Sequence, residues 1–135
     1  MSVLTAVPAA NDMTRMRLFS SFIKRFIPSQ MFQNLSPHEF HEALIASKNA
    51  VLIDVRTPSE FQAGHIPGAV NIDIMSPHFS HRVTTLDPSA TYFVNCQSGG
   101  RSARACTYLM KQGIEAPVNL KGGMIAWMAA KKPIE

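Results

Sequence analysis

One stretch decides how this chain folds: Thr91-Tyr92-Phe93-Val94-Asn95-Cys96-Gln97-Ser98-Gly99-Gly100-Arg101-Ser102. Its first five residues are of types that suit a buried strand. A single cysteine follows, then a short glycine-containing turn, then an alanine-rich run that predicts a helix over 102–112. A thiol between a strand and a helix N-terminus lies where the helix dipole and free backbone N–H groups favour negative charge. Such surroundings lower the pKa of a cysteine and make its thiolate a nucleophile.

Strand and helix signals alternate on both sides of this stretch. We expect further strands at 31–34, 51–55, 69–72 and 117–120, and further helices at 37–47, after Thr57, at 76–85, and from Gly122-Gly123 onward. This alternation predicts an α/β domain with a mostly parallel sheet. Ligands of such sheets bind beyond the carboxyl ends of the strands, which is where Cys96 lies.

Two of the expected helices begin with the same capping device. Ser36 and Thr57 are each followed by proline and, three residues on, by Glu39 and Glu60 respectively. A hydroxyl and a glutamate at this spacing satisfy each other's backbone N–H groups in a capping box. Both helix starts are therefore predicted from local chemistry alone.

Composition and charge exclude several classes of protein. The chain has 135 residues, of which 46% are hydrophobic, enough for one domain with its own core. Its net charge is +4, but residues 1–30 hold four basic side chains against one acidic one, so residues 31–135 are nearly neutral. We expect no nucleic-acid binding. Two cysteines without metal-ligand spacing favour a reducing compartment and no structural zinc.

The first 30 residues form an arm with a basic amphipathic helix over 13–27. Large apolar side chains recur at helical spacing, with basic residues between them, until Pro28. Three uses of this helix stay open: packing on its own domain or a partner subunit, lying on a membrane surface, or binding a specific partner. No apolar run is long enough to span a membrane, and charges interrupt any signal-peptide pattern, so we expect a cytoplasmic protein.

Three stretches together resemble the single-domain form of the rhodanese (thiosulfate sulfurtransferase) family. They are Leu52-Ile53-Asp54-Val55-Arg56-Thr57-Pro58-Ser59-Glu60-Phe61 continuing to Gly64-His65-Ile66-Pro67-Gly68-Ala69, then Cys96-Gln97-Ser98-Gly99-Gly100-Arg101-Ser102, and Leu120-Lys121-Gly122-Gly123-Met124-Ile125-Ala126-Trp127. The resemblance covers about residues 31–132. It divides the chain into the arm, 1–30, and a rhodanese-like domain, 31–135.

The resemblance implies a five-stranded parallel sheet flanked by helices on both faces and a cysteine persulfide intermediate. Cys96 would carry the sulfur, and the substrate-binding loop would consist of Gln97, Ser98, Gly99, Gly100, Arg101 and Ser102. Many members of the family place a basic residue directly after the cysteine, where this chain has Gln97. The mouth of the loop therefore has one positive charge fewer, which leaves the preferred donor open.

The chemistry of the loop suits sulfur transfer. Small residues let successive N–H groups turn inward as an anion-binding nest, for which Gly99 and Gly100 can take positive φ angles. Arg101 can offer a guanidinium to an oxyanion. Four residues separate Cys96 from Arg101, whereas cysteine-based phosphatases have five, so we expect sulfur rather than phosphoryl chemistry. The reaction needs no metal or organic cofactor, and its kinetics should be ping-pong.

Other candidate residues have structural explanations. We expect Asp54 and Arg56 to support neighbouring loops through hydrogen bonds or an ion pair, and Cys106 to be a buried core residue. The remaining candidates are a turn residue, a core or pocket-wall residue and two pairs of solvent-facing histidines: His65, Trp127, His38 with His41, and His78 with His81.

Two functions follow from the sequence. The first is a sulfurtransferase that moves sulfane sulfur from a small anion such as thiosulfate, through a Cys96 persulfide, to cyanide, a thiol or a protein acceptor. The second is a relay or binding module without turnover, which carries persulfide between protein partners; Gln97 and the basic arm motivate it.

Overall fold

The structure is a computed structural model that describes residues 32–135, so the predicted helix over 13–27 lies outside the described residues. Phe32–Glu135 form one compact unit. Five strands alternate with five helices along this unit, as the sequence predicts.

All five strands join one parallel sheet, in the order β1-β5-β4-β2-β3. They are β1 (Gln33–Leu35), β2 (Ala50–Asp54), β3 (Val70–Asn71), β4 (Thr91–Asn95) and β5 (Val118–Leu120). The longest pairing joins β2 to β4, and it runs from Ala50 beside Thr91 to Asp54 beside Asn95. The strand that leads to Cys96 therefore lies in the middle of the sheet.

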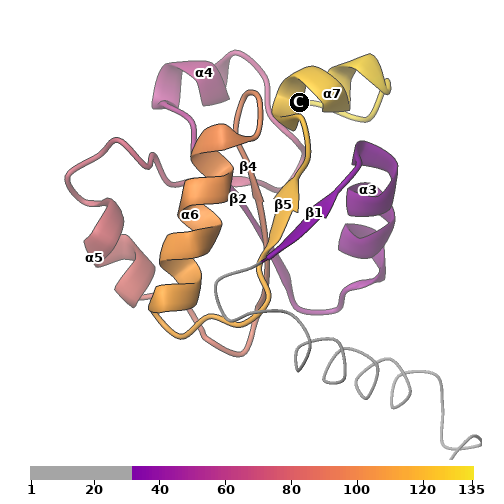
Figure 1. Cartoon of the computed structure of the whole chain (residues 1–135). Coiled ribbons are helices and arrows are strands. Elements are labelled where there is room, and N and C mark those ends of the chain that lie inside the picture. The colour runs from indigo at the N-terminus through magenta and orange to yellow at the C-terminus, as the bar shows by residue number, and fades with distance from the viewer. Residues whose placement is uncertain (1–31) are drawn as a thin grey trace, which may run out of the picture. The chain divides into compact units, whose positions relative to one another are not determined.

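Helices cover both faces of the sheet, which confirms the predicted architecture (Figure 1). They are α3 (Pro37–Ala46), α4 (Pro58–Gln62), α5 (Phe79–Thr84), α6 (Gly100–Lys111) and α7 (Gly123–Ala129). Helices α5 and α6 lie on one face and α3 and α7 on the other, while α4 lies at the end of the sheet where β2 and β4 finish (Figure 1).

Each face has its own apolar cluster. On the α5 and α6 face, Val94, Cys106 and Leu109 are buried with residues of β2 and α5. On the α3 and α7 face, Phe40 meets Phe93 and Trp127 edge-on, with ring centroids 5.3 and 6.1 Å apart. Alternate residues of β4 thus serve opposite faces, as expected for a strand covered on both sides.

The predicted capping boxes are both present. The Ser36 and Thr57 hydroxyls accept the N–H groups of Glu39 and Glu60, whose carboxylates accept the capping N–H groups in return. These contacts fix the start of α3 and of α4.

Two helix starts differ from the prediction. Helix α6 begins at Gly100 rather than Ser102, because Gly99 takes a left-handed conformation with φ 106° and turns the chain into the helix early. Helix α5 begins at Phe79 rather than near Ser76, because local hydrogen bonds hold 73–78 in turns: the Asp73 carboxylate accepts the Met75 N–H and the Ser76 hydroxyl accepts the His78 N–H. None of the helices in 32–135 is long and apolar enough to cross a bilayer.

Candidate active site

Cys96 directly follows β4 at the carboxyl end of the sheet, and its side chain is only 1% exposed. Four residues, Cys96 to Gly99, connect the strand to α6. The thiol is thus placed between a central strand and a helix N-terminus, as the sequence predicts. Because it is so deeply set, a reacting sulfur must reach it end-on.

Hydrogen-bond donors gather around the sulfur. The Gly99 N–H lies 3.1 Å from Cys96 Sγ and the Ser102 hydroxyl 3.3 Å from it. Burial is the largest single influence on the pKa of Cys96 and would raise it, but the hydrogen bonds from the Ser102 hydroxyl and from the backbone N–H groups of Ser102, Gly99 and Ser98 together outweigh burial. The pKa of Cys96 is therefore lowered, which favours the thiolate.

The carbonyl groups of the loop are held away from the sulfur. The Met124 N–H donates to the Cys96 carbonyl at 2.9 Å and the Ile125 N–H to the Gln97 carbonyl at 3.1 Å, both from the first turn of α7. On the other side of the loop, the Asn119 amide lies 3.4 Å from the Gly99 carbonyl. With its carbonyls bound elsewhere, the loop can turn its N–H groups toward the thiolate.

Glycines permit this close packing at two positions. Gly99 takes the positive φ that the nest requires, whereas Gly100 is an ordinary first helical residue without a positive φ. Gly123 has φ 59°, and a Cβ there would lie 2.5 Å from the carbonyl carbon and oxygen of Gln97. Only a glycine at the start of α7 lets this helix approach the cysteine loop.

Asp54 and Arg56 form a buried ion pair beneath the loop. The Arg56 guanidinium donates to the Asp54 carboxylate at 2.8 to 3.1 Å, to the Gly64 carbonyl at 2.7 Å and to Gln97 Oε1 at 3.2 Å. The pair orders two loops at once, and it positions the neutral side chain that follows the cysteine. Neither residue of the pair contacts the sulfur.

Arg101 is bound to a carboxylate of the neighbouring helix. Its guanidinium donates to Glu60 at 2.7 and 2.9 Å in a two-point contact, with the two side chains 24% and 32% exposed. The same hydrogen bonds, aided by the Thr57 cap, lower the pKa of Glu60 from 4.5 to about 2. The positive charge expected at the loop mouth is thus balanced by a carboxylate in this structure.

The residues with a predicted structural role are mostly placed as expected. Cys106 is fully buried, and burial, with a smaller effect of nearby Cys96, raises its pKa to about 12. Trp127 is buried and donates to the Pro133 carbonyl at 2.7 Å. His65 stacks on Phe61 with centroids 3.8 Å apart.

One expectation for the histidines is wrong. His41 does not face solvent freely, since its ring meets Trp127 edge-on with centroids 5.3 Å apart. Within 32–135, no group of three or more histidine, cysteine, aspartate or glutamate side chains is arranged to hold a metal ion.

Sequence reasoning missed three contributors to the site. Glu60 was recognised only as a capping residue, although its carboxylate also holds Arg101. Gly123 was recognised only as a helix start, and Asn119 not at all. The four-residue spacing of Glu60 within its own motif carries no sign of a partner 41 positions later in the chain, so only the fold reveals that contact.

Comparison with known proteins agrees with this geometry. The model of the rhodanese-like domain matches residues 36–130. A sulfurtransferase of Allochromatium vinosum is 33% identical over 104 residues, which cover 77% of this chain and 95% of that protein. The thiosulfate sulfurtransferase GlpE of Ectopseudomonas mendocina is 36% identical, with 73% of this chain and 86% of that protein covered.

Solved structures give the same result. The crystal structure of a rhodanese-related protein from Thermoplasma volcanium has a TM-score of 0.68 and 27% identity, and covers 77% of this chain and 98% of that one. Family model, sequence relatives and structural neighbour all coincide on the unit that holds the Cys96 loop. This chain therefore belongs to the rhodanese-like domain family.

Proposed function

We propose that the protein is a sulfurtransferase that carries sulfane sulfur as a persulfide on Cys96, between a donor such as thiosulfate and a thiophilic acceptor. One observation carries the proposal: the Cys96 sulfur is surrounded by hydrogen-bond donors that outweigh the cost of its burial. A thiolate held in this way is a nucleophile at neutral pH.

The first half-reaction transfers sulfur to the enzyme. The Cys96 thiolate attacks the sulfane sulfur of thiosulfate, the sulfur–sulfur bond breaks, and sulfite leaves with the electron pair. The enzyme then carries a persulfide, whose outer sulfur is anionic near neutral pH. The N–H groups of Ser98 and Gly99, with the Ser102 hydroxyl, stabilise this charge as they stabilise the thiolate.

The second half-reaction restores the thiolate. Cyanide attacks the outer sulfur, the persulfide bond breaks, and thiocyanate forms while the electron pair returns to Cys96. A thiol acceptor reacts at the same sulfur and leaves as its own persulfide. The chain's own residues supply the nucleophile and the charge stabilisation for both steps.

A second candidate is a relay module that receives and passes persulfide between proteins without fast turnover. The observation that favours it is the balanced charge at the loop mouth. Arg101 is paired with Glu60, Arg56 with Asp54, and the residue after the cysteine is the neutral Gln97. A mouth of this kind attracts small dianions less than one with a free cation does.

Steady-state kinetics with thiosulfate and cyanide test the proposal. We expect saturation with both substrates, parallel lines in double-reciprocal plots, and loss of turnover in Cys96→Ser but not in Cys106→Ala. Turnover that survives Cys96→Ser would overturn the proposal. Formation of the persulfide without appreciable thiocyanate production would favour the relay over the free-standing enzyme.

A further inference from the structure

A second polar site lies beside the cysteine loop. It is a pocket of about 220 Å³ between α4, the segment after β3, and α5. Its lining combines apolar and charged side chains: Pro58, Asn71, Ile72, Asp73, Ser76, Phe79 and Arg82. At about 30 Å³ per water molecule, this space holds on the order of seven waters, or the head group of one amino acid.

The two charged residues of the pocket are not paired with each other. Within 32–135, neither Arg82 nor Asp73 takes part in an ion pair. Arg82 donates one hydrogen bond to the Asn71 carbonyl at 3.2 Å, and Asp73 accepts the Met75 N–H at 2.8 Å. A guanidinium and a carboxylate that line one cavity without neutralising each other complement a zwitterion, which brings a carboxylate for Arg82 and an ammonium group for Asp73.

The pocket shares both an edge and a face of the sheet with Cys96. Ile72 and Asp73 follow β3 as Cys96 follows β4, and β2 lies between these two strands. Adjacent strands are spaced by about 4.8 Å, so the two sites are separated by about 10 Å along the edge. Ile72, Phe79 and Cys96 also belong to one apolar cluster, on the α5 and α6 face.

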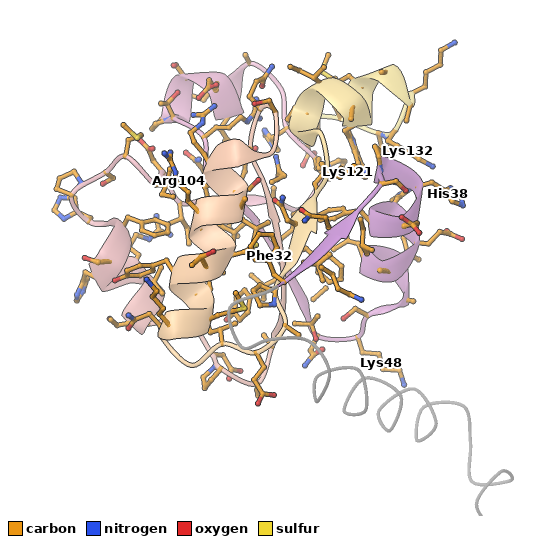
Figure 2. The ribbon with its side chains drawn as sticks, viewed as in Figure 1. Phe32, His38, Lys48, Arg104, Lys121 and Lys132 are labelled. Atoms are coloured by element: carbon orange, nitrogen blue, oxygen red, sulfur yellow. The ribbon has the colours of Figure 1, made fainter. Side chains whose placement is uncertain are left out.

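A second cation borders the pocket from α6. Tyr108 packs on Phe79, with ring centroids 5.6 Å apart, so this face of α6 is turned toward α5. Arg104 is one turn before Tyr108 on the same face, exposed, and without an ion pair among residues 32–135. Figure 2 shows Arg104 on the side of α6 toward the segment that leads to α5. A second carboxylate on the ligand can meet this guanidinium.

We infer that this pocket binds the amino-acid end of a small peptide persulfide and so directs its sulfane sulfur to Cys96; the inference rests on the proposed function. An extended chain spans about 3.3 to 3.6 Å per residue, so a distance of about 10 Å requires a carrier of two to three residues. Pro58, Ile72 and Phe79 supply apolar walls for its methylene groups. A single amino acid is too short, and thiosulfate has no group for the pocket.

The transfer step is the same exchange with a different leaving group. The Cys96 thiolate attacks the terminal sulfur of the R–S–SH donor, the bond between the two donor sulfurs breaks, and the peptide thiolate leaves with the electron pair. The proton stays on the transferred sulfur, so the products are the Cys96 persulfide and the free peptide thiolate. The pocket residues take no part in bond making, and they act only by holding the carrier.

Donor kinetics on the full chain test this assignment, with glutathione persulfide and thiosulfate as the two probes. The variants are Arg82→Gln, Asp73→Asn and, as a control for lost surface charge, Lys111→Gln. We expect Arg82→Gln to lower kcat/KM for glutathione persulfide about tenfold, through KM, because a charge-assisted hydrogen bond is lost. Thiosulfate should be used as well as by the wild type, and Arg82→Lys should recover part of the loss.

A binding measurement separates the pocket from the chemistry. Unreactive S-methylglutathione should bind to the wild type and to Cys96→Ser alike in calorimetry, and about tenfold more weakly to Arg82→Gln. Equal losses with both donors, or no change in either variant, would overturn the pocket assignment while leaving the persulfide mechanism intact. If the wild type forms no persulfide from either donor, both the pocket assignment and the proposed function fail.

Discussion

At Cys96 one hydroxyl and three backbone N–H groups compete against burial for control of the thiol. The hydrogen bonds prevail, so the pKa of Cys96 is lowered while that of Cys106, which lies in the core, is raised to about 12. Two cysteines ten positions apart thus differ in reactivity because of their surroundings. Near neutral pH, Cys96 is the one that supplies a thiolate.

Removing the Ser102 hydroxyl should make Cys96 less reactive. We expect Ser102→Ala to raise the pKa of Cys96 and to slow its alkylation by iodoacetamide at pH 7 about tenfold, since a hydrogen bond to a charged group is worth about 1.5–3 kcal/mol. Alkylation rate against pH measures this, and the midpoint should move to higher pH. An unchanged profile would mean that the backbone N–H groups alone set the pKa.

Glu60 should make stability depend on pH in the acid range. Its hydrogen bonds with Arg101 lower its pKa from 4.5 to about 2, so its contribution is complete above about pH 4.5 and is lost as the pH falls toward 2. We expect Glu60→Gln to cost about 1 kcal/mol at pH 7, because the pair is partly exposed. Urea unfolding at several pH values should show a smaller acid loss in the variant than in the wild type.

At the level of single residues, sequence reasoning found side chains but not all of their partners. The cysteine and the Asp54–Arg56 pair could be identified, because strand, turn and helix signals place them locally. The contact between Arg101 and Glu60 could not, since it joins α6 to α4 across 41 positions. The guanidinium that looks free in the sequence is bound in the fold.

At the level of elements, the first turn of α7 holds the cysteine loop in place. Its N–H groups bind the Cys96 and Gln97 carbonyls, and Gly123 lets the two backbones approach closely. The sequence predicts that a helix begins here, but its service to a loop more than twenty residues earlier depends on the parallel pairing of β4 with β5. The early start of α6 has a comparable cause, because the conformation of Gly99 depends on the same packing.

Alanine substitutions at two glycines should have opposite effects. A Cβ at Gly123 would lie 2.5 Å from Gln97 and force a positive φ on alanine, so we expect Gly123→Ala to destabilise the protein by several kcal/mol and to abolish sulfur transfer. Gly100 has open space and helical geometry, so Gly100→Ala should leave stability equal or raise it by about 0.5 kcal/mol. Thermal unfolding of both variants measures the contrast, and equal effects would contradict it.

At the level of the whole molecule, the unit Phe32–Glu135 contains the complete sheet, both apolar clusters and the cysteine loop. The alternating strand and helix signals predicted a parallel α/β sheet, and the family resemblance predicted five strands. The strand order β1-β5-β4-β2-β3 results from contacts between distant segments, which no local pattern encodes.

Truncation tests how far this unit is independent of the arm. A protein without residues 1–31 should unfold in one cooperative transition with the urea midpoint of the full chain, and should form persulfide at the same rate. Co-sedimentation of both forms with anionic vesicles then addresses the predicted amphipathic helix. Aggregation or loss of the transition in the shorter form would show that the arm is part of the fold.

The most direct test of the central claim is the intact mass of the protein after incubation with thiosulfate and removal of excess donor. We predict that the wild type and Cys106→Ala each gain the mass of one sulfur atom, that this sulfur maps to Cys96, and that cyanide removes it. Cys96→Ser should gain nothing. Sulfur found on Cys96→Ser, or on Cys106 of the wild type, would contradict the account.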